Sequence, residues 1–123
     1  MSTSLTPEPL VIRGDHIQLQ QVILNLIVNA IDAMSDVSSA KRQIFVRTTR
    51  IPDFAELTVS DTGPGIPPEK LRSVFEPFFT TKAEGMGIGL SIVRTIVEAH
   101  NGQIVAENQA RGGATFRIRL PLA

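Results

Sequence analysis

Asp15–Met34, with the sequence DHIQLQQVILNLIVNAIDAM, decides the fold of this chain. At 100° per residue this stretch is a helix that is apolar nearly all round. Its apolar surface is made by Leu19, Val22, Ile23, Leu26, Ile27, Ala30 and Met34, widened by Leu24, Val28 and Ile31. Because so wide an apolar surface has to be buried against other elements, the rest of the chain is expected to pack around this helix.

One narrow polar strip interrupts that apolar surface. It consists of residues that fall within roughly 80° of one another on the helix, namely Gln18, Gln21, Asn25, Asn29 and Asp32. A solvated helix face would be wide and rich in Lys and Glu, whereas this strip is narrow and rich in amides. It is therefore interpreted as the lining of a pocket for a polar ligand. A buried helix with a few hydrogen-bonded amides is the alternative.

The composition is that of one globular domain. The chain has 123 residues, 42% hydrophobic and 20% charged, which is enough for one core and too little for two. Twelve Lys and Arg balance twelve Asp and Glu, so no charge surplus points to nucleic acid or to membrane contact. The absence of cysteine excludes disulfides, thiolate metal sites and a cysteine nucleophile. No apolar run is long enough to cross a membrane, and a cytoplasmic location is expected.

Apolar alternation and turn residues predict the remaining elements. Residues 1–9 are expected to be a disordered lead-in or a boundary within a longer protein, and residues 10–123 the domain. A second helix is predicted at Leu90–His100, and strands at Leu10–Arg13, Gln43–Arg50, Ala55–Ser60, Gln103–Glu107 and Ala114–Leu120. Together they predict an α/β two-layer sandwich: a mixed, mostly antiparallel sheet of about five strands with helices packed on one face.

Asn25 and Asn29 form the first motif that indicates chemistry. They are one helical turn apart, so both side-chain amides lie on one face and could reach the same ion or phosphate group. Neutral amide oxygens can complete the coordination of Mg²⁺ when phosphate and water supply its other ligands. The pair therefore indicates a site for magnesium and phosphate on the long helix.

Asp61, Gly63 and Gly65 form the second motif, D-x-G-x-G, at the end of a predicted strand. A buried carboxylate there needs a hydrogen-bond donor, and the exocyclic amine of adenine would supply one. The two glycines would let the backbone approach a flat ring closely. A purely structural turn is the alternative, because this pattern is common in turns.

Gly85, Gly87 and Gly89 form the third motif and lead into the second helix. Glycines at a helix N-terminus free backbone N–H groups for phosphate, and the helix dipole favours the negative charge. The spacing is not G-x-G-x-x-G, and it follows a loop rich in Phe and Thr rather than a strand, so dinucleotide binding of the Rossmann type is excluded. A P-loop is excluded too, because the chain has no G-x-x-x-x-G-K-[ST] sequence.

In this order, and together with FEPFFTTK at Phe75–Lys82, the motifs closely resemble the ATP-binding catalytic domain of bacterial sensor histidine kinases. NLIVNAIDAM resembles the N box of that family, DTGPGI the first glycine box, FEPFFTTK the F box and GMGIGL the second glycine box. The closing GGATFRIRLP is similar to the family's last strand, so the resemblance runs from about Val11 to Leu122. It implies the Bergerat fold of the gyrase, chaperone, histidine kinase and mismatch-repair ATPases.

The resemblance also implies a role for each motif. Asn29 is the expected magnesium ligand and Asn25 its polar neighbour at the phosphates, and both are the expected catalytic residues. Asp61 is expected to bind the adenine amino group, helped through water by Thr115. The implied nucleotide-binding set, for ATP with Mg²⁺, comprises Asn25, Asn29, Asp32, Asp61, Gly63, Gly65, Ile66, Thr80, Thr81, Lys82, Gly85, Met86, Gly87, Ile88, Gly89, Leu90 and Thr115.

Two positions refine the expected chemistry. The hydrolysing relatives of this superfamily carry Glu where Asn25 stands, and Asn cannot act as a general base. The domain is therefore expected to hold ATP without hydrolysing it. Many sensor kinases carry a basic residue where Asp32 stands, so we hypothesise that Lys82, from a short lid over the phosphates, supplies the positive charge instead.

The implied activity is that of a protein histidine kinase in two-component signalling. The domain would bind Mg·ATP and donate the γ-phosphoryl group to a histidine on a separate dimerisation domain. His16 and His100 lack the following acidic residue that is typical of an acceptor, so autophosphorylation by this chain alone is not expected. The expected partners are that histidine-bearing domain and, indirectly, a response regulator, and the isolated domain is expected to be a monomer. Two alternatives remain: a regulatory serine kinase of the anti-sigma-factor type, and a degenerate docking module without nucleotide.

Overall fold

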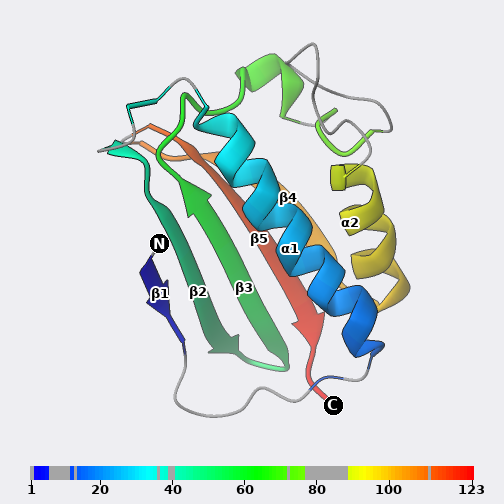
Figure 1. Cartoon of the computed structure of the whole chain (residues 1–123). Helices are drawn as coiled ribbons and strands as arrows, with labels where there is room; N and C mark the ends of the chain where they lie inside the picture. The colour runs from blue at the N-terminus through cyan, green and yellow to red at the C-terminus, as the bar shows by residue number, and fades with distance from the viewer. Residues whose placement is uncertain are drawn as a thin grey trace.

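The computed structural model describes residues 2–5, 12, 14–35, 37–38, 41–71, 73–76, 89–110 and 112–123. In these residues a five-stranded sheet carries two long helices on one face and leaves the other face open (Figure 1). The helices are α1 (His16–Ala33) and α2 (Gly89–Ala99), and the strands are β1 (Ser2–Ser4), β2 (Ile44–Ile51), β3 (Phe54–Asp61), β4 (Gln103–Asn108) and β5 (Ala114–Pro121). The predicted two-layer α/β sandwich is confirmed.

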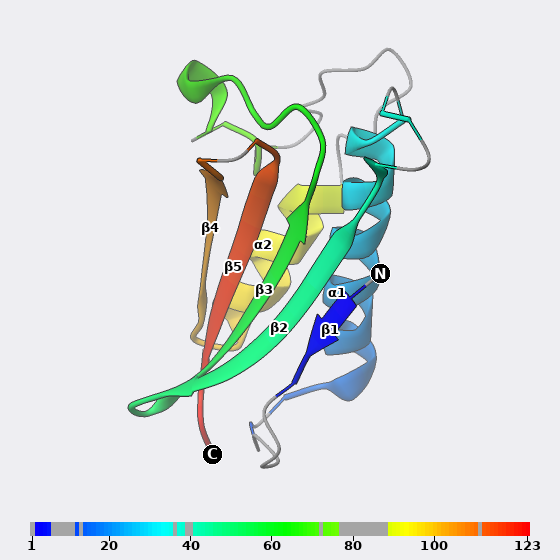
Figure 2. The same ribbon diagram turned by 90° about the vertical axis from the view of Figure 1, so that its left-hand side faces the viewer.

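The sheet has the strand order β1-β2-β3-β5-β4. β1 pairs with β2 in parallel, and the other three pairs are antiparallel, so the sheet is mixed and mostly antiparallel as predicted. Parallel neighbours need a crossover connection, which α1 provides between β1 and β2. The β2–β3 hairpin closes with Ile51 opposite Phe54, and Asp53 in its turn has a φ of 67°. Seen from the side, both helices lie behind the sheet (Figure 2).

The first strand lies earlier in the chain than its predicted position. Ser2–Ser4 pairs with Phe45–Arg47, whereas Ile12, within the predicted strand Leu10–Arg13, is in no strand. The other residues of that prediction lie outside the described part of the chain. The expected disordered lead-in is therefore not met at Ser2–Ser4. The physical reason is that Ser-Thr-Ser has no apolar alternation, so only its backbone pairing with β2 defines it as a strand.

The core lies between the helices and the sheet. α1 contributes Val22, Leu26 and Ala30, all at most 2% exposed, and α2 contributes Val93 and Val97. The rest of the α1 surface does not follow the expected burial, because Leu24 is 60% and Ile31 51% exposed. In a two-layer fold a helix is covered by the sheet on one side only. The wide apolar surface of α1 is therefore partly in the core and partly exposed.

Side-chain hydrogen bonds hold the start of α1 and the end of α2. The Asp15 carboxylate accepts hydrogen bonds from the backbone N–H groups of Ile17 and Gln18, at 2.9 and 3.3 Å, as an N-cap should. At the end of α2, the His100 ring nitrogen Nδ1 lies 2.8 Å from the Ile96 carbonyl oxygen, and Nε2 accepts from the Asp15 N–H at 3.1 Å. Through these two contacts the His100 ring joins the start of α1 to the end of α2.

Candidate functional site

Asp61 is the chemical centre of the site. It is the last residue of β3 and is 2% exposed. Its Oδ1 accepts hydrogen bonds from the backbone N–H of Gly63 at 2.8 Å and of Ala114 at 3.3 Å. Within the described part of the chain no hydrogen bond reaches Oδ2. One carboxylate oxygen is thus held by the protein, while the other can accept from a ligand.

Burial raises the pKa of the Asp61 carboxyl above its ordinary value, although the N–H groups of Gly63 and Ala114 act in the opposite direction. A carboxyl group with this environment takes up a proton at a higher pH than an exposed aspartate does. The deprotonated form offers two acceptor oxygens and no donor, whereas the protonated form carries an O–H donor on one of them. A ligand that donates a hydrogen bond to Asp61 therefore favours the deprotonated form.

The two glycines after Asp61 allow close approach of the backbone. A Cβ on Gly63 would lie 2.9 Å from the Ala33 carbonyl oxygen and 3.0 Å from Asp61 Oδ1, so the loop rests directly on the end of α1. Gly65 has a φ of +83°, and a Cβ there would lie 2.8 Å from Asn108 Oδ1. Both glycines therefore have a packing reason to be present. This reason does not exclude the predicted close approach of a ring.

Asn108, at the end of β4, holds the same loop from the other side. Its Oδ1 accepts from the Ile66 N–H at 2.7 Å, and its Nδ2 donates to the Ile66 carbonyl oxygen at 2.6 Å. The neighbouring Gln109 Nε2 reaches the carbonyl oxygen of Asp61 at 3.4 Å. Sequence analysis missed both residues, because their partners lie more than forty positions away in the chain.

The polar strip of α1 faces the same end of the molecule. Asn25, Asn29 and Asp32 are half-buried, in contrast to the exposed Gln18 and Gln21. α1 ends, β3 ends and α2 begins toward one end of the fold (Figure 1). This arrangement brings the C-terminal part of the polar strip, the carboxylate and a helix N-terminus toward one end of the fold.

Comparison with known proteins assigns the family. Residues 14–123 match the family described as histidine kinase-, DNA gyrase B-, and HSP90-like ATPase. The chain belongs to this ATPase family. It is 46% identical over 120 residues to the sensor protein FixL of Bradyrhizobium diazoefficiens, covering 98% of this chain and 24% of FixL. It is 44% identical over 114 residues to the sensor histidine kinase TmoS of Ectopseudomonas mendocina, covering 91% of this chain and 12% of TmoS.

Solved structures agree with this family assignment. The catalytic domain of histidine kinase ThkA superposes with a TM-score of 0.86 at 34% identity, covering 98% of this chain and 77% of that chain. The mycobacterial sensor histidine kinase MprB gives 0.83 at 34% identity, covering 98% and 80%. The chain is therefore a histidine kinase ATPase domain of the two-component sensor kinases. It spans a quarter or less of FixL and TmoS.

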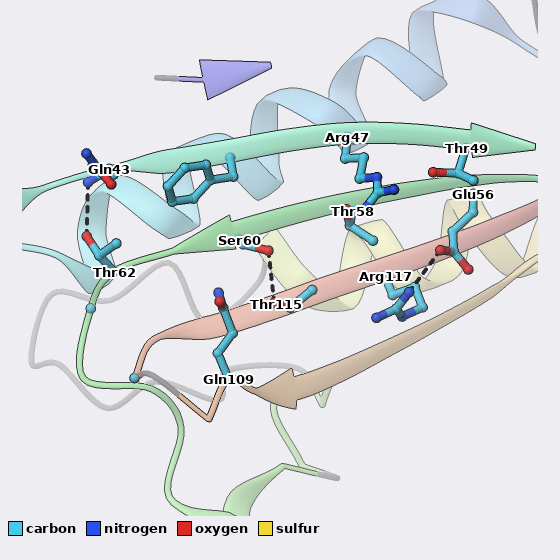
Figure 3. Close-up of a pocket in the computed structure, with 13 residues that line it drawn as sticks. Gln43, Arg47, Thr49, Glu56, Thr58, Ser60, Thr62, Gln109, Thr115 and Arg117 are labelled. Carbon is cyan, nitrogen blue, oxygen red and sulfur yellow. Dashed lines mark hydrogen bonds and ion pairs between the residues drawn. The ribbon is translucent and has the colours of Figure 1, made fainter. Parts of the chain in front are cut away.

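Thr115 does not take the position in this ATPase domain that the family resemblance implies. Its Oγ1 hydrogen-bonds Ser60 Oγ at 2.9 Å, and both line a hollow of about 720 Å³ on the open face of the sheet (Figure 3). Asp61 lies on the other face, because side chains alternate along β3. The expected help from Thr115 to Asp61 is therefore wrong. Ala114 lies on the Asp61 side and contributes its backbone N–H.

Ion pairs connect side chains of neighbouring strands on the open face of the kinase domain sheet. Arg117 contacts Glu56 at 2.8 Å and Glu107 at 3.0 Å, and Arg119 contacts Glu56 at 2.9 Å. The carboxylates raise the pKa of Arg117, that of Glu107 first, although burial opposes the shift. We regard this face as a solvated sheet surface, separate from the Asp61 site.

Several predicted residues of the ATPase site lie outside the described part of the chain: Thr80, Thr81, Lys82, Gly85, Met86, Gly87 and Ile88. Their roles stay predictions. The two residues that follow them are described, since Gly89 begins α2 and Leu90 is buried in the core. Ile66, which precedes Pro67 and Pro68 in its loop, is partly buried and packs against the core.

The donor set of the ATPase site fits a metal that arrives with its own ligands. In the described residues no group of three or more His, Cys, Asp or Glu side chains could hold a metal ion. The amides of Asn25 and Asn29 are neutral and supply too few oxygens for a magnesium cage. Phosphate oxygens and water would have to complete the coordination.

Among the described helices, none is both long and apolar enough to pass through a bilayer.

Proposed function

We propose that this domain binds Mg·ATP and donates its γ-phosphoryl group to a histidine on a separate domain of its parent kinase. The observation that carries the proposal is the buried Asp61 carboxylate, whose Oδ1 is held by two backbone N–H groups. Its Oδ2 has no hydrogen bond from the described residues and would accept one from a ligand donor such as the exocyclic amine of adenine. The family membership supports the nucleotide as that ligand.

The phosphates would lie over the polar strip of α1 and the N-terminus of α2. Asn29 would ligate magnesium and Asn25 would lie beside the phosphates, with Asp32 at the end of the strip. Magnesium would neutralise charge on the phosphates during transfer. The chain's residues would position the γ-phosphoryl group for in-line attack. Because Asn25 cannot take a proton from water, hydrolysis should stay slow.

The partner proposals rest on the relatives. FixL and TmoS are sensor proteins, and histidine kinase ThkA has been solved in complex with the response regulator protein TrrA. We infer that this chain acts, in the cytoplasm, on a histidine-bearing dimerisation domain, and indirectly on a response regulator. As an isolated domain it should be a monomer. A trans-phosphorylation assay that combines this chain, Mg·ATP and such an acceptor domain tests the transfer step.

Nucleotide binding is tested first by calorimetric titration of the wild-type chain with ATP and ADP, with and without Mg²⁺. Asn29→Asp adds a negative charge at the proposed metal site, so free ATP should bind more weakly and Mg·ATP should be less affected. The ratio of the two affinities should then rise about fivefold or more. Gln21→Glu is the matched control, because it adds the same charge to an exposed part of the strip.

An unchanged ratio in Asn29→Asp would remove Asn29 from the metal site. Absence of any nucleotide binding by the wild-type chain, with or without Mg²⁺, would overturn the proposed function itself.

Lys82→Ala tests the lid hypothesis. If Lys82 supplies the positive charge at the γ-phosphate, its loss should weaken ATP binding about tenfold and ADP binding far less. Both affinities can be measured in the same titrations. Equal losses for the two nucleotides would contradict the assignment, since ADP lacks the γ-phosphate.

A further inference from the structure

We propose that Asn108 is a positioning residue that holds the nucleotide loop, Asp61–Pro68, in its binding conformation before the ligand arrives. This inference rests on the proposed function, because it concerns the same site. It extends that function to a residue of β4 that none of the sequence motifs contains.

The Asn108 side chain contacts the backbone of Ile66 in the way that a neighbouring β-strand would. Oδ1 accepts from the Ile66 N–H at 2.7 Å and Nδ2 donates to the Ile66 carbonyl oxygen at 2.6 Å. A side-chain amide therefore pairs both backbone groups of one loop residue, as a neighbouring strand would. Only one orientation of the amide satisfies both bonds, which fixes the side chain as well as the loop.

Among the described residues, the other hydrogen bonds from the β4–β5 side of the sheet to this loop reach only Asp61, at the start of the loop. A hollow of about 540 Å³ lies between the loop and the β4–β5 turn, lined on the loop side by Pro64 and Ile66 and on the turn side by Gln109 and Gly112. Asn108 also lines this hollow, and its two hydrogen bonds join the loop to β4 beside it. Gly65 has room for them only because it lacks a Cβ, which would lie 2.8 Å from Asn108 Oδ1.

The loop so held is the one that carries the ligand-binding groups. Gly63, which donates to Asp61 Oδ1, and Ile66 are three residues apart on it. Fixing the loop in advance removes an ordering cost from ligand binding and so raises affinity. The effect acts at the base end of the nucleotide, because Asp61 is the proposed adenine contact. Loss of the two Asn108 hydrogen bonds should therefore weaken the binding of ATP and of ADP equally.

The test compares Asn108→Ala and Asn108→Asp with Gln103→Ala in the 123-residue chain. Asn108→Asp keeps the size of the side chain but places a second acceptor against the Ile66 carbonyl oxygen. Gln103 is an exposed residue at the other end of β4, and its side-chain amide makes no hydrogen bond to a described residue. We expect both Asn108 variants to weaken ATP and ADP about tenfold, the loss expected for two hydrogen bonds, and Gln103→Ala to change neither.

Hydrogen exchange of the Ile66 amide separates positioning from general destabilisation. Exchange at Ile66 should be faster in both Asn108 variants, while the core amides and Tm stay close to those of the wild type. Unchanged nucleotide affinity in both variants, or unchanged Ile66 exchange, would overturn the inference. If the wild-type chain binds no nucleotide, the proposed function fails, and Ile66 exchange still decides whether Asn108 holds the loop.

Discussion

Asp61→Asn should raise the Kd for ATP and ADP at least about a hundredfold and leave the fold intact. The amide oxygen can still accept from Gly63 and Ala114, so the hydrogen bonds that organise the strand end are kept. The amide nitrogen then stands where Oδ2 stood and presents a donor to the donor on adenine. A site built to accept a hydrogen bond from its ligand rejects a group that cannot be paired by a factor of this order.

The same substitution should make the chain more stable at neutral pH. Burial raises the pKa of Asp61 above 3.8, so the folded state holds its proton at pH values where the unfolded state has lost it. Wild-type stability therefore falls as the pH rises from 3.8 through the raised value. The Asn side chain does not titrate, so the stability of Asp61→Asn does not fall in this way. The stability of Asp61→Asn relative to the wild type should increase over this interval.

Two measurements check these expectations together. Calorimetry gives the nucleotide affinities, and thermal unfolding at a series of pH values from about pH 4 to about pH 7 gives the difference in stability. Nucleotide binding by Asp61→Asn within about threefold of the wild type would remove Asp61 from the adenine site. A difference in stability that does not change with pH would mean that the Asp61 pKa is not raised by folding.

Gly113→Ala should be among the most destabilising single substitutions in the domain. Gly113 has a φ of +87°, and a Cβ there would overlap the Asp61 carbonyl oxygen and lie 2.9 Å from the Asp61 carbonyl carbon. These are backbone atoms at the end of β3, which pairs with β5, so they cannot move aside without opening the sheet. We expect a loss of about 3 kcal/mol or more in the free energy of unfolding. Tm should fall by about 10 °C.

Gly112→Ala is the matched control for this prediction. Gly112 is the adjacent residue and has a similar φ of +97°, yet nothing lies within 4 Å of the position of its Cβ. Its substitution should therefore cost only the backbone term, about 1 kcal/mol. Denaturant unfolding of both variants measures the difference. Equal losses would show that the close approach to Asp61 is not what requires Gly113.

Local patterns in the sequence were sufficient for much of the site. Helical periodicity placed α1 and its Asn25–Asn29 face, because this signal acts over one or two turns of helix. Asp61 was identified as a buried carboxylate at a strand end from the polarity of one residue after an apolar strand. The loop motif then pointed to the ligand chemistry. These features depend on neighbours in the chain, so the sequence contains them directly.

Only the tertiary structure decided which residues complete the site. Asn108 and Ile66 are 42 positions apart, and no local pattern predicts that one amide pairs with the backbone of the other. Pairing with β2 made Ser2–Ser4 a strand without any apolar signal. Thr115 faces away from Asp61 because its neighbours Ala114 and Phe116 are in the core. The reason is common to all three: long-range partners are chosen by packing and strand register, which short sequence patterns do not contain.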